Sequence, residues 1–214
     1  AGLPDDVDVD ARLGTGRDRT TRAVVAALAD VPSARRPPGT AFAYSNAGYV
    51  CLALAVELAA GQALPAFAEE RLFAPLGMRD TVFWPGPGPV PPAGVPLSPP
   101  RPAPLSLGDG GMWSTANDLM RWSRGMNDDV LDIAARVQTP GRLDDGRPLD
   151  YGWGVGIRTH AGHDVYRHGG GWSDVRLLHA RIPARRTSLL VVALRDHSDR
   201  RVVLADALIT RLCG

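Results

Sequence analysis

The stretch DVYRHGGGWSDVRLLHARIPARRTSLLVVAL, residues 164–194, predicts the fold, because three of its segments have the composition of β-strands. We expect strands at Asp164 to His168, Asp174 to Ile182 and Ser188 to Leu194. The connections between them are short and contain Gly, Ser and Pro, which are typical turn residues. Three consecutive strands with short connections indicate an antiparallel meander.

The residues on either side of this stretch extend the same arrangement. Tyr151 to Arg158 alternates and contains Val and Ile with Gly interruptions, which predicts a further strand. Arg200 to Leu212 predicts an amphipathic helix that packs on the sheet. One face of this helix is apolar and consists of Val203, Leu204, Ala207, Leu208 and Leu212.

Helices are expected upstream of the sheet, each bounded by residues that cap or end helices. Residues 1–20 are polar and rich in Gly and Asp, and we expect a loop there. The 46–60 segment is so apolar that we expect a mostly buried helix. The expected helices are Arg22 to Ala29 after Thr20 or Thr21, Asn46 to Ala60 ended by Gly61, about Pro65 to Leu72, and Ser114 or Thr115 to about Met126.

Helices followed by an antiparallel sheet with a terminal helix indicate an α+β fold. Ten prolines fall within residues 85–104, which excludes regular helix or central strand there. We interpret this stretch as a long surface crossing within a helical subdomain, residues 1–150. Residues 151–214 then hold the sheet strands and the C-terminal helix, and the two parts together form one domain.

The composition excludes several classes of partner. The 24 basic and 23 acidic residues give a net charge of +1, so we expect no nucleic acid. No apolar run approaches the length of a membrane span, and the N-terminus has no signal pattern, so the compartment stays open. Two cysteines, Cys51 and Cys213, are too few for a disulfide framework. All basic residues are Arg, and the chain contains no Lys.

Tyr44-Ser45-Asn46 lies between a turn and the 46–60 helix, where a scaffold presents polar side chains to a cleft. A Tyr hydroxyl can relay a proton if nearby cations lower its pKa, and an Asn amide can donate to a substrate carbonyl. The alternative is that Asn46 is the N-cap of the helix and that Tyr44 only packs.

His168-Gly169-Gly170-Gly171 follows one expected strand and precedes another. Consecutive glycines let a ligand approach closely, and their N–H groups can serve as oxyanion donors. The alternative is a glycine-rich hairpin turn with a surface His. His160 and His163 flank a turn without a further metal ligand, so we expect no metal and no cofactor.

Taken together, four segments resemble the serine β-lactamase-like family, which includes class C β-lactamases, other penicillin-binding proteins, D-alanyl-D-alanine carboxypeptidases, D-aminopeptidases and related esterases. They occur in the family's order over nearly the whole chain. These segments are PGT with YSNAGY (residues 38–40 and 44–49), FAPLGM with DT (73–78 and 80–81), GGMWSTANDL (110–119) and HGGG (168–171).

The resemblance implies a fold in which the tyrosine block faces the strand that carries the HGGG segment. It implies that Tyr44 assists proton transfer and that His168, in the place of the usual Lys or His, helps to polarise that tyrosine. The reaction class would be acylation and deacylation of a serine through an acyl-enzyme. The implied substrate-binding residues are Asn46, Gly169, Gly170 and Gly171, with the Gly171 N–H as an oxyanion donor.

The chain departs from the family in its nucleophile. The family's serine lies in a Ser-x-x-Lys motif upstream of the tyrosine block, and a chain without Lys contains no such motif. The first residues, AGLPD, resemble the segment that follows this helix in the family. We therefore expect the C-terminal portion of the fold, without the nucleophile helix and the first strands. Ser45 has no positioned base and is not expected to substitute.

Two functional hypotheses follow. The first is that the chain is part of a longer serine hydrolase of peptide, amide or ester bonds, inactive as these 214 residues alone. The second is a catalytically dead homologue that keeps the cleft as a binding module. Either way, the expected partner is a small molecule or peptide, β-lactams included. We also expect self-association, because one sheet edge and part of the apolar face of the terminal helix would be exposed.

Overall fold

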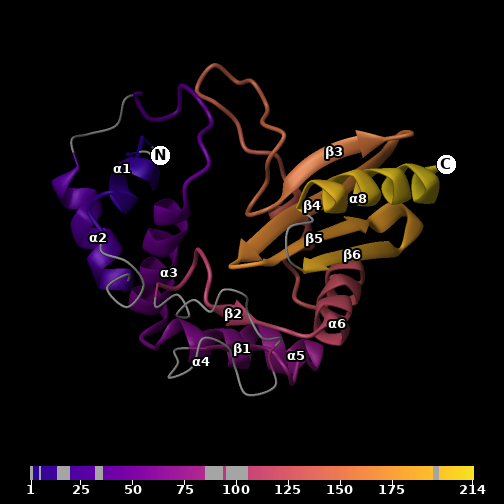
Figure 1. Ribbon diagram of the computed structural model, residues 1–214, viewed down its shortest axis with the longest axis horizontal. Helices are drawn as coiled ribbons and strands as arrows, with labels where there is room; N and C mark the ends of the chain where they lie inside the picture. The colour runs from indigo at the N-terminus through magenta and orange to yellow at the C-terminus, as the bar shows by residue number, and fades with distance from the viewer. Residues whose placement is uncertain are drawn as a thin grey trace.

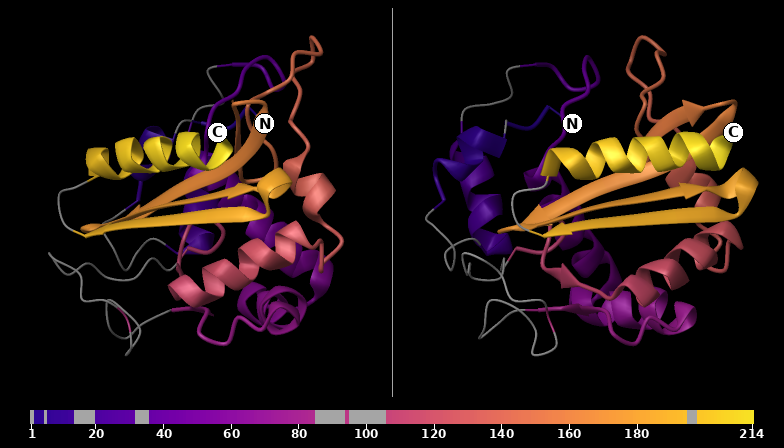
Figure 2. Two further views of the ribbon diagram at one scale, coloured as in Figure 1. Left: turned by 90° about the vertical axis from the view of Figure 1, so that its right-hand side faces the viewer. Right: turned by 45° about the vertical axis from the view of Figure 1, so that its right-hand side comes forward.

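The computed structural model of the chain describes residues 2–4, 6–13, 20–31, 36–84, 94, 106–194 and 198–214. A sheet with a long helix, α8 (Ser198–Cys213), lies at one side, and the N-terminal helices lie at the other (Figure 1). Figure 2 shows α8 on one face of the sheet and α6 (Ala116–Asn127) on the opposite face. This combination of helices with an antiparallel sheet is the α+β class that the sequence predicts.

The sheet contains the four expected strands, each antiparallel to its neighbours, in the order β3-β4-β5-β6. Their bounds are β3 (Gly156–His160), β4 (His163–Trp172), β5 (Val175–Ile182) and β6 (Thr187–Leu194). The strand expected from Tyr151 begins later, and Tyr151 itself makes only an isolated bridge to Gly156. The three glycines lie within β4 and not in a turn, because their backbone pairs with β5 through to Trp172.

Helix α8 packs on the sheet through small and medium side chains. Ala205, Ile209 and Cys213 are buried against a cluster that includes Val165 and Leu178 of the strands. The predicted apolar face is therefore wrong as the packing face. The face of Ala205, Ile209 and Cys213 is buried in its place.

Three of the apolar side chains on the predicted packing face of α8 are exposed instead. Val203 is 71% exposed and Leu204 is 51% exposed, and Leu212 is exposed as well. At the end of the sheet order, β6 has no partner strand on its outer side among the described residues. The expected exposure of one sheet edge and of part of the apolar helix face is thus confirmed.

The first residues form a helix, α1 (Asp6–Asp10), and the expected loop over residues 1–20 is wrong at this point. Val9 of α1 is almost fully buried and packs with Val24 of α2 (Thr21–Asp30) and Val50 of α3 (Asn46–Ala60). This packing stabilises a short helix whose own sequence carries no strong helical signal.

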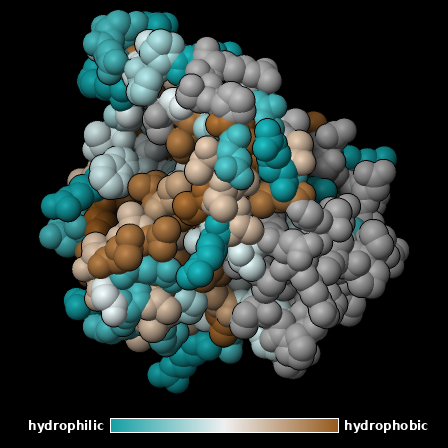
Figure 3. All heavy atoms as spheres, turned by 90° about the vertical axis from the view of Figure 1, so that its left-hand side faces the viewer, coloured by the Kyte–Doolittle hydropathy of each residue, from teal (hydrophilic) through white to brown (hydrophobic). Residues whose placement is uncertain are grey.

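Helix α3 has the expected bounds, because both ends carry local signals. Gly61 ends the helix in the left-handed region, with φ of 67°. The expectation that α3 is mostly buried is wrong. Leu52 and Leu58 are 57% and 77% exposed, and only the face of Ala47, Val50 and Ala53 is buried. Figure 3, which views the molecule from the side of α1 and α2, shows apolar residues gathered between polar ones.

A longer helical segment than expected follows α3. It runs without a break through α4 (Leu64–Ala68), the π-helical turn η2 (Glu69–Phe73) and α5 (Ala74–Leu76), and ends at Gly77 in the left-handed region. No single helix in the described ranges is long and apolar enough to cross a membrane. Helix α3 and residues Leu64–Leu76 reach that length and apolar composition only when they are counted together, and the two are bent by 77° relative to each other.

Two short strands and one short helix complete the structure, and the sequence patterns did not predict them. The strands β1 (Val82–Phe83) and β2 (Met112–Trp113) pair antiparallel, and α7 (Ala134–Gln138) precedes the sheet.

The proline-rich crossing at 85–104 lies outside the described residues except for Gly94. Helix α6 begins after Thr115, whose hydroxyl accepts from Asp118 N, as the sequence predicts. The division at residue 150 stays a prediction.

Buried polar contacts join α6 to the sheet. Ser123 Oγ lies 2.5 Å from His179 Nε2, and Arg181 donates to the Asn127 side chain at 2.8 Å. Burial, and then the charge of Arg181, lower the pKa of His179 to about 4. In the folded chain this imidazole is therefore neutral near neutral pH.

We predict that the chain loses stability as the pH falls from about 6.5 toward 4. The unfolded His179 titrates near its ordinary pKa of about 6.5, so protons bind to the unfolded state first. The loss is expected to be about 2–3 kcal/mol. Urea unfolding at a series of pH values measures it. His179→Gln should flatten the curve over this range, and His163→Gln at the β3–β4 turn serves as the control. An unchanged curve in His179→Gln would contradict the assignment.

Candidate functional site

The N-terminus of α3 is fixed by an aspartate that lies 40 residues away in the sequence. Asp6 accepts from Asn46 N at 2.7 Å, Ala47 N at 3.1 Å and the Ser45 hydroxyl at 3.2 Å. Ser45 is the N-cap, since its hydroxyl also accepts from Gly48 N. The alternative role of Asn46 as N-cap is thus excluded. A carboxylate at the first turn is favourable because the unpaired N–H groups there carry partial positive charge.

Capping by Ser45 and Asp6 leaves the two neighbouring side chains available. Tyr44 is 48% exposed and stands immediately before the helix. The Asn46 side chain makes no hydrogen bond within the described part of the chain. These are the two side chains of the segment that the sequence singles out for chemistry.

Opposite them, β4 presents one unpaired edge. Its pairing with β3 ends at Gly156 and Arg167, whereas its pairing with β5 continues to Trp172. From His168 onward, β4 therefore has a strand partner on one side only among the residues described. An unpaired strand edge offers backbone N–H and C=O groups to a ligand.

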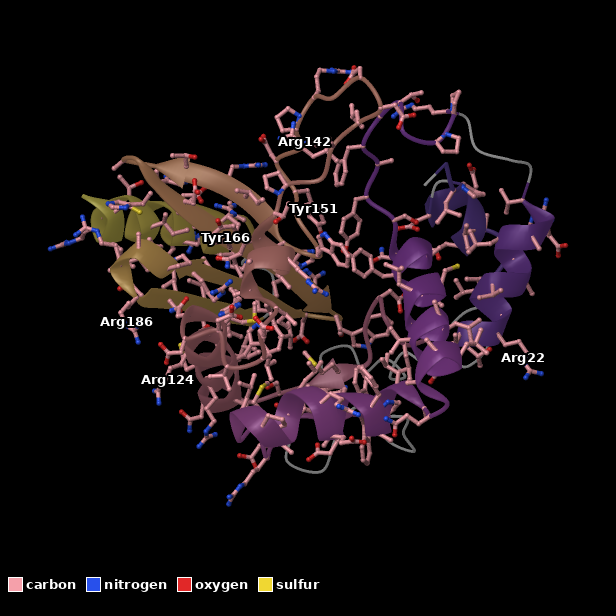
Figure 4. All side chains as sticks on the ribbon, turned by 180° about the vertical axis from the view of Figure 1, so that it is seen from behind. Arg22, Arg124, Arg142, Tyr151, Tyr166 and Arg186 are labelled. Carbon is pink, nitrogen blue, oxygen red and sulfur yellow. The ribbon has the colours of Figure 1, made fainter. Side chains whose placement is uncertain are left out.

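Tyr44, His168 and a second tyrosine, Tyr151, meet at this edge. The ring centroids of Tyr44 and His168 lie 6.0 Å apart, and those of Tyr44 and Tyr151 lie 6.4 Å apart. His168 Nε2 is 3.1 Å from the Tyr151 hydroxyl, so the histidine is hydrogen-bonded to Tyr151 and not to Tyr44. In Figure 4, Tyr151 lies between the sheet and the segment that leads into α3.

Both tyrosine hydroxyls stay protonated in this environment. Burial raises the pKa of Tyr44, and the neighbouring Tyr49, Asp6 and Asp109 raise it further. Burial and the neighbouring tyrosines likewise raise the pKa of Tyr151. The cationic environment that a proton-relaying Tyr44 needs is not supplied by these groups.

The glycines of β4 are explained in part by arginines that cover them. A Cβ at Gly171 would lie 2.5 Å from Cδ of Arg176, and a Cβ at Gly169 would lie 4.0 Å from Nη2 of Arg201. Gly170 has the side chain of Leu177 as its neighbour at 3.7 Å. Only at Gly171 would a side chain collide with an arginine, and all three glycines remain exposed.

The structure brings Tyr44 and His168 together, places Asn46 beside Tyr44 and puts Gly169–Gly171 along the same edge. Sequence reasoning missed Tyr151 and Asp6. Tyr151 stands before GWG in a segment that the sequence indicates as a strand, so no local signal separated it from a packing residue. Asp6 acts through a contact of long sequence separation, which no local pattern reveals.

Comparison with known proteins places this arrangement among relatives. The sequence model of the family described as Beta-lactamase matches residues 1–212. A D-aminopeptidase of Cereibacter sphaeroides is 29% identical over 203 residues, which are 87% of this chain and 38% of that protein. The D-alanyl-D-alanine-carboxypeptidase/endopeptidase AmpH of Escherichia coli is 30% identical over 207 residues, 83% of this chain and 52% of AmpH.

Solved structures show the same fold. The penicillin-binding protein from Bacillus halodurans has a TM-score of 0.76 at 24% identity, covering 98% of this chain and 69% of that one. The chain spans between 38% and 52% of the two curated relatives described above. Because the family model covers almost every residue, the chain belongs to the Beta-lactamase family.

Proposed function

We propose that the chain is the tyrosine-and-sheet part of a serine hydrolase that cleaves amide or ester bonds through an acyl-enzyme. The observation that carries this proposal is the meeting of Tyr44 with His168 and Tyr151 at the unpaired edge of β4. A substrate backbone lying along that edge would have its carbonyl near the glycine N–H groups. The relatives support hydrolysis of amide bonds, since they are named D-aminopeptidase and D-alanyl-D-alanine-carboxypeptidase/endopeptidase.

The serine nucleophile and its lysine would come from polypeptide outside these 214 residues. The chain contains no Lys, so it has no Ser-x-x-Lys motif of its own. The raised pKa of Tyr44 supports this division of roles. A lysine brought against Tyr44 would supply the positive charge that favours its ionised form, and proton transfer through the tyrosine would follow.

Within this proposal each residue has one task. Tyr44 passes a proton between the serine and the leaving group, and the Asn46 amide donates to the substrate carbonyl. The Gly171 N–H is one oxyanion donor. His168, with Tyr151 as its hydrogen-bond partner, lines the side of the site opposite α3. D-amino-acid peptides and amides are the first substrates to test.

The second candidate is a homologue without catalysis that keeps the cleft to bind a ligand. The absence of Lys favours this candidate as much as it favours a divided enzyme. A reading frame upstream that encodes Ser-x-x-Lys distinguishes the two, because a binding module has no need of it.

We predict that the 214-residue chain alone is not acylated by a labelled penicillin. Without a serine–lysine pair, only binding and oxyanion contributions remain, and these form no covalent bond. Intact-mass spectrometry after incubation measures the adduct. A stoichiometric adduct on any serine of this chain would contradict the division of the site.

The second prediction concerns reconstitution with the Ser-x-x-Lys segment of a relative. Tyr44→Phe should lower the activity of the reconstituted enzyme about 10²- to 10⁴-fold, since general acid–base catalysis typically contributes a rate increase of that size. His168→Ala should cost less, because His168 is hydrogen-bonded to Tyr151 and not to Tyr44. Hydrolysis of a D-alanine amide measures both, and Tyr166→Phe on β4 is the matched control. Equal activity in Tyr44→Phe and wild type would show that the site is misplaced.

We also propose that the isolated chain self-associates through the outer edge of β6, where Val192 is 51% exposed and no residue is charged. Val192→Lys should shift the sedimentation profile toward the monomer. Val130→Lys, at a similarly exposed site off the sheet, should leave the profile unchanged. A wild-type chain that is monomeric at high concentration would be the contrary result.

A further inference from the structure

The two tyrosines of the candidate site come from two segments that also contact each other outside the site. The tyrosine segment, residues 37–45, leads into α3 and carries Tyr44. The hairpin, residues 141–149, leads directly to Tyr151. In Figure 4 this hairpin, marked by Arg142, lies beside the chain that enters α3. Whatever fixes the hairpin to the tyrosine segment therefore bears on how the two tyrosines stand to each other.

The tip of the hairpin is held by its own hydrogen bonds. Leu143 N donates to Arg147 O at 3.0 Å, and Gly146 N donates to Leu143 O at 2.9 Å. Gly146 is in the left-handed region with φ of 85°, as in a hairpin loop that closes with a glycine bulge. The Asp145 carboxylate accepts from the Arg147 backbone and side chain within the same loop. These bonds do not use the N–H of Asp144, which turns toward the tyrosine segment.

Asp144 contacts Gly39 with both its backbone and its side chain. Its N–H donates to Gly39 O at 3.0 Å. Gly39 has φ of 78°, and a Cβ there would collide with the Asp144 carboxylate. Within the described residues, this is the only backbone hydrogen bond from residues 37–44 to another segment. Position 39 therefore favours glycine twice, through its backbone conformation and through the space that Asp144 occupies.

The tyrosine segment and the hairpin side meet a second time at the site itself. The ring centroids of Phe42 and Tyr151 lie 5.2 Å apart, and those of Tyr44 and Tyr151 lie 6.4 Å apart. Aromatic pairs are favourable over a range of tilts and centroid distances, so these rings alone leave freedom to slide. A directional hydrogen bond at Gly39 restricts that freedom, because Tyr44 follows only five positions later.

We propose that the contact between Asp144 and Gly39 is a latch that fixes the tyrosine segment to the hairpin and so sets the position of Tyr44 relative to Tyr151. Gly39 and Asp144 are positioning residues, because they lie outside the site and act on it through the two tyrosines. The latch is a property of the 214-residue chain. Its effect on catalysis rests on the proposed function, in which Tyr44 transfers a proton and tolerates little displacement.

Fluorine NMR of the 214-residue chain, with 3-fluorotyrosine at its four tyrosines, tests the latch. Each resonance is assigned with a Tyr→Phe variant. Gly39→Ala places a methyl group where the Asp144 carboxylate lies and should move the Tyr44 and Tyr151 resonances. Gly162→Ala is the matched control, because Gly162 in the β3–β4 turn has the same φ of 78° and nothing within 4 Å of its Cβ position. The control should leave both resonances in place.

Asp144→Pro tests the latch from the hairpin and replaces Gly39→Ala if circular dichroism shows that variant to be unfolded. Proline is favoured at the second position of a turn such as 143–146, so the turn is kept while the N–H that donates to Gly39 is lost. The Tyr44 and Tyr151 resonances should move again. Unmoved resonances in the folded variants, or an Asp144 amide that exchanges without protection in the wild-type chain, overturn the latch.

The effect on catalysis is measured in the reconstituted enzyme. Gly39→Ala should lower kcat about 2- to 10-fold, the population change that loss of one ordinary hydrogen bond produces. The KM should not change, because the β4 edge and the Asn46 backbone are held by other contacts. An unchanged kcat in a variant whose resonances move refutes the positioning role. If Tyr44→Phe is itself as active as wild type, the proposed function fails, whereas the spectra of the 214-residue chain still decide the latch.

Discussion

The register between β4 and β5 determines to which face of the sheet the side chains of the HGGG strand point. Tyr166 to Trp172 pair residue by residue with Arg181 to Val175, straight through the three glycines. Because successive side chains of a strand point to opposite faces, His168 lies on the α6 face and Arg167 and Gly169 lie on the α8 face. A slip of one residue would exchange the two sets and dismantle both sides at once.

A second constraint positions the partner of that strand. Asp6 holds the first turn of α3 by two backbone N–H groups and one hydroxyl, so Tyr44 stands at a fixed corner. The same carboxylate also contributes to raising the pKa of Tyr44. The cap therefore orders the tyrosine and at the same time favours its protonated form. Under the proposed function, proton transfer through Tyr44 would need added positive charge, and no Arg of the described residues contributes to the pKa of Tyr44.

The sequence predicted what local chemistry specifies. The bounds of α3 follow from Ser45 and Gly61, and the meander follows from apolar runs with short turns, so both could be predicted. The wrong predictions concern contacts between segments that are distant in the sequence. Helix α1 forms because Val9 finds a hydrophobic cluster made by α2 and α3, which no short window contains.

The predictions of the packing face of α8 and of the position of the glycines were wrong for a related reason. Hydrophobicity alone favoured Val203 and Leu204, but Ala205, Ile209 and Cys213 are the residues of α8 that are buried on the sheet. Glycine is typical of turns, but Gly169 to Gly171 lie in a strand because their backbone pairs with β5, and at Gly171 the Arg176 side chain occupies the space where a side chain would be.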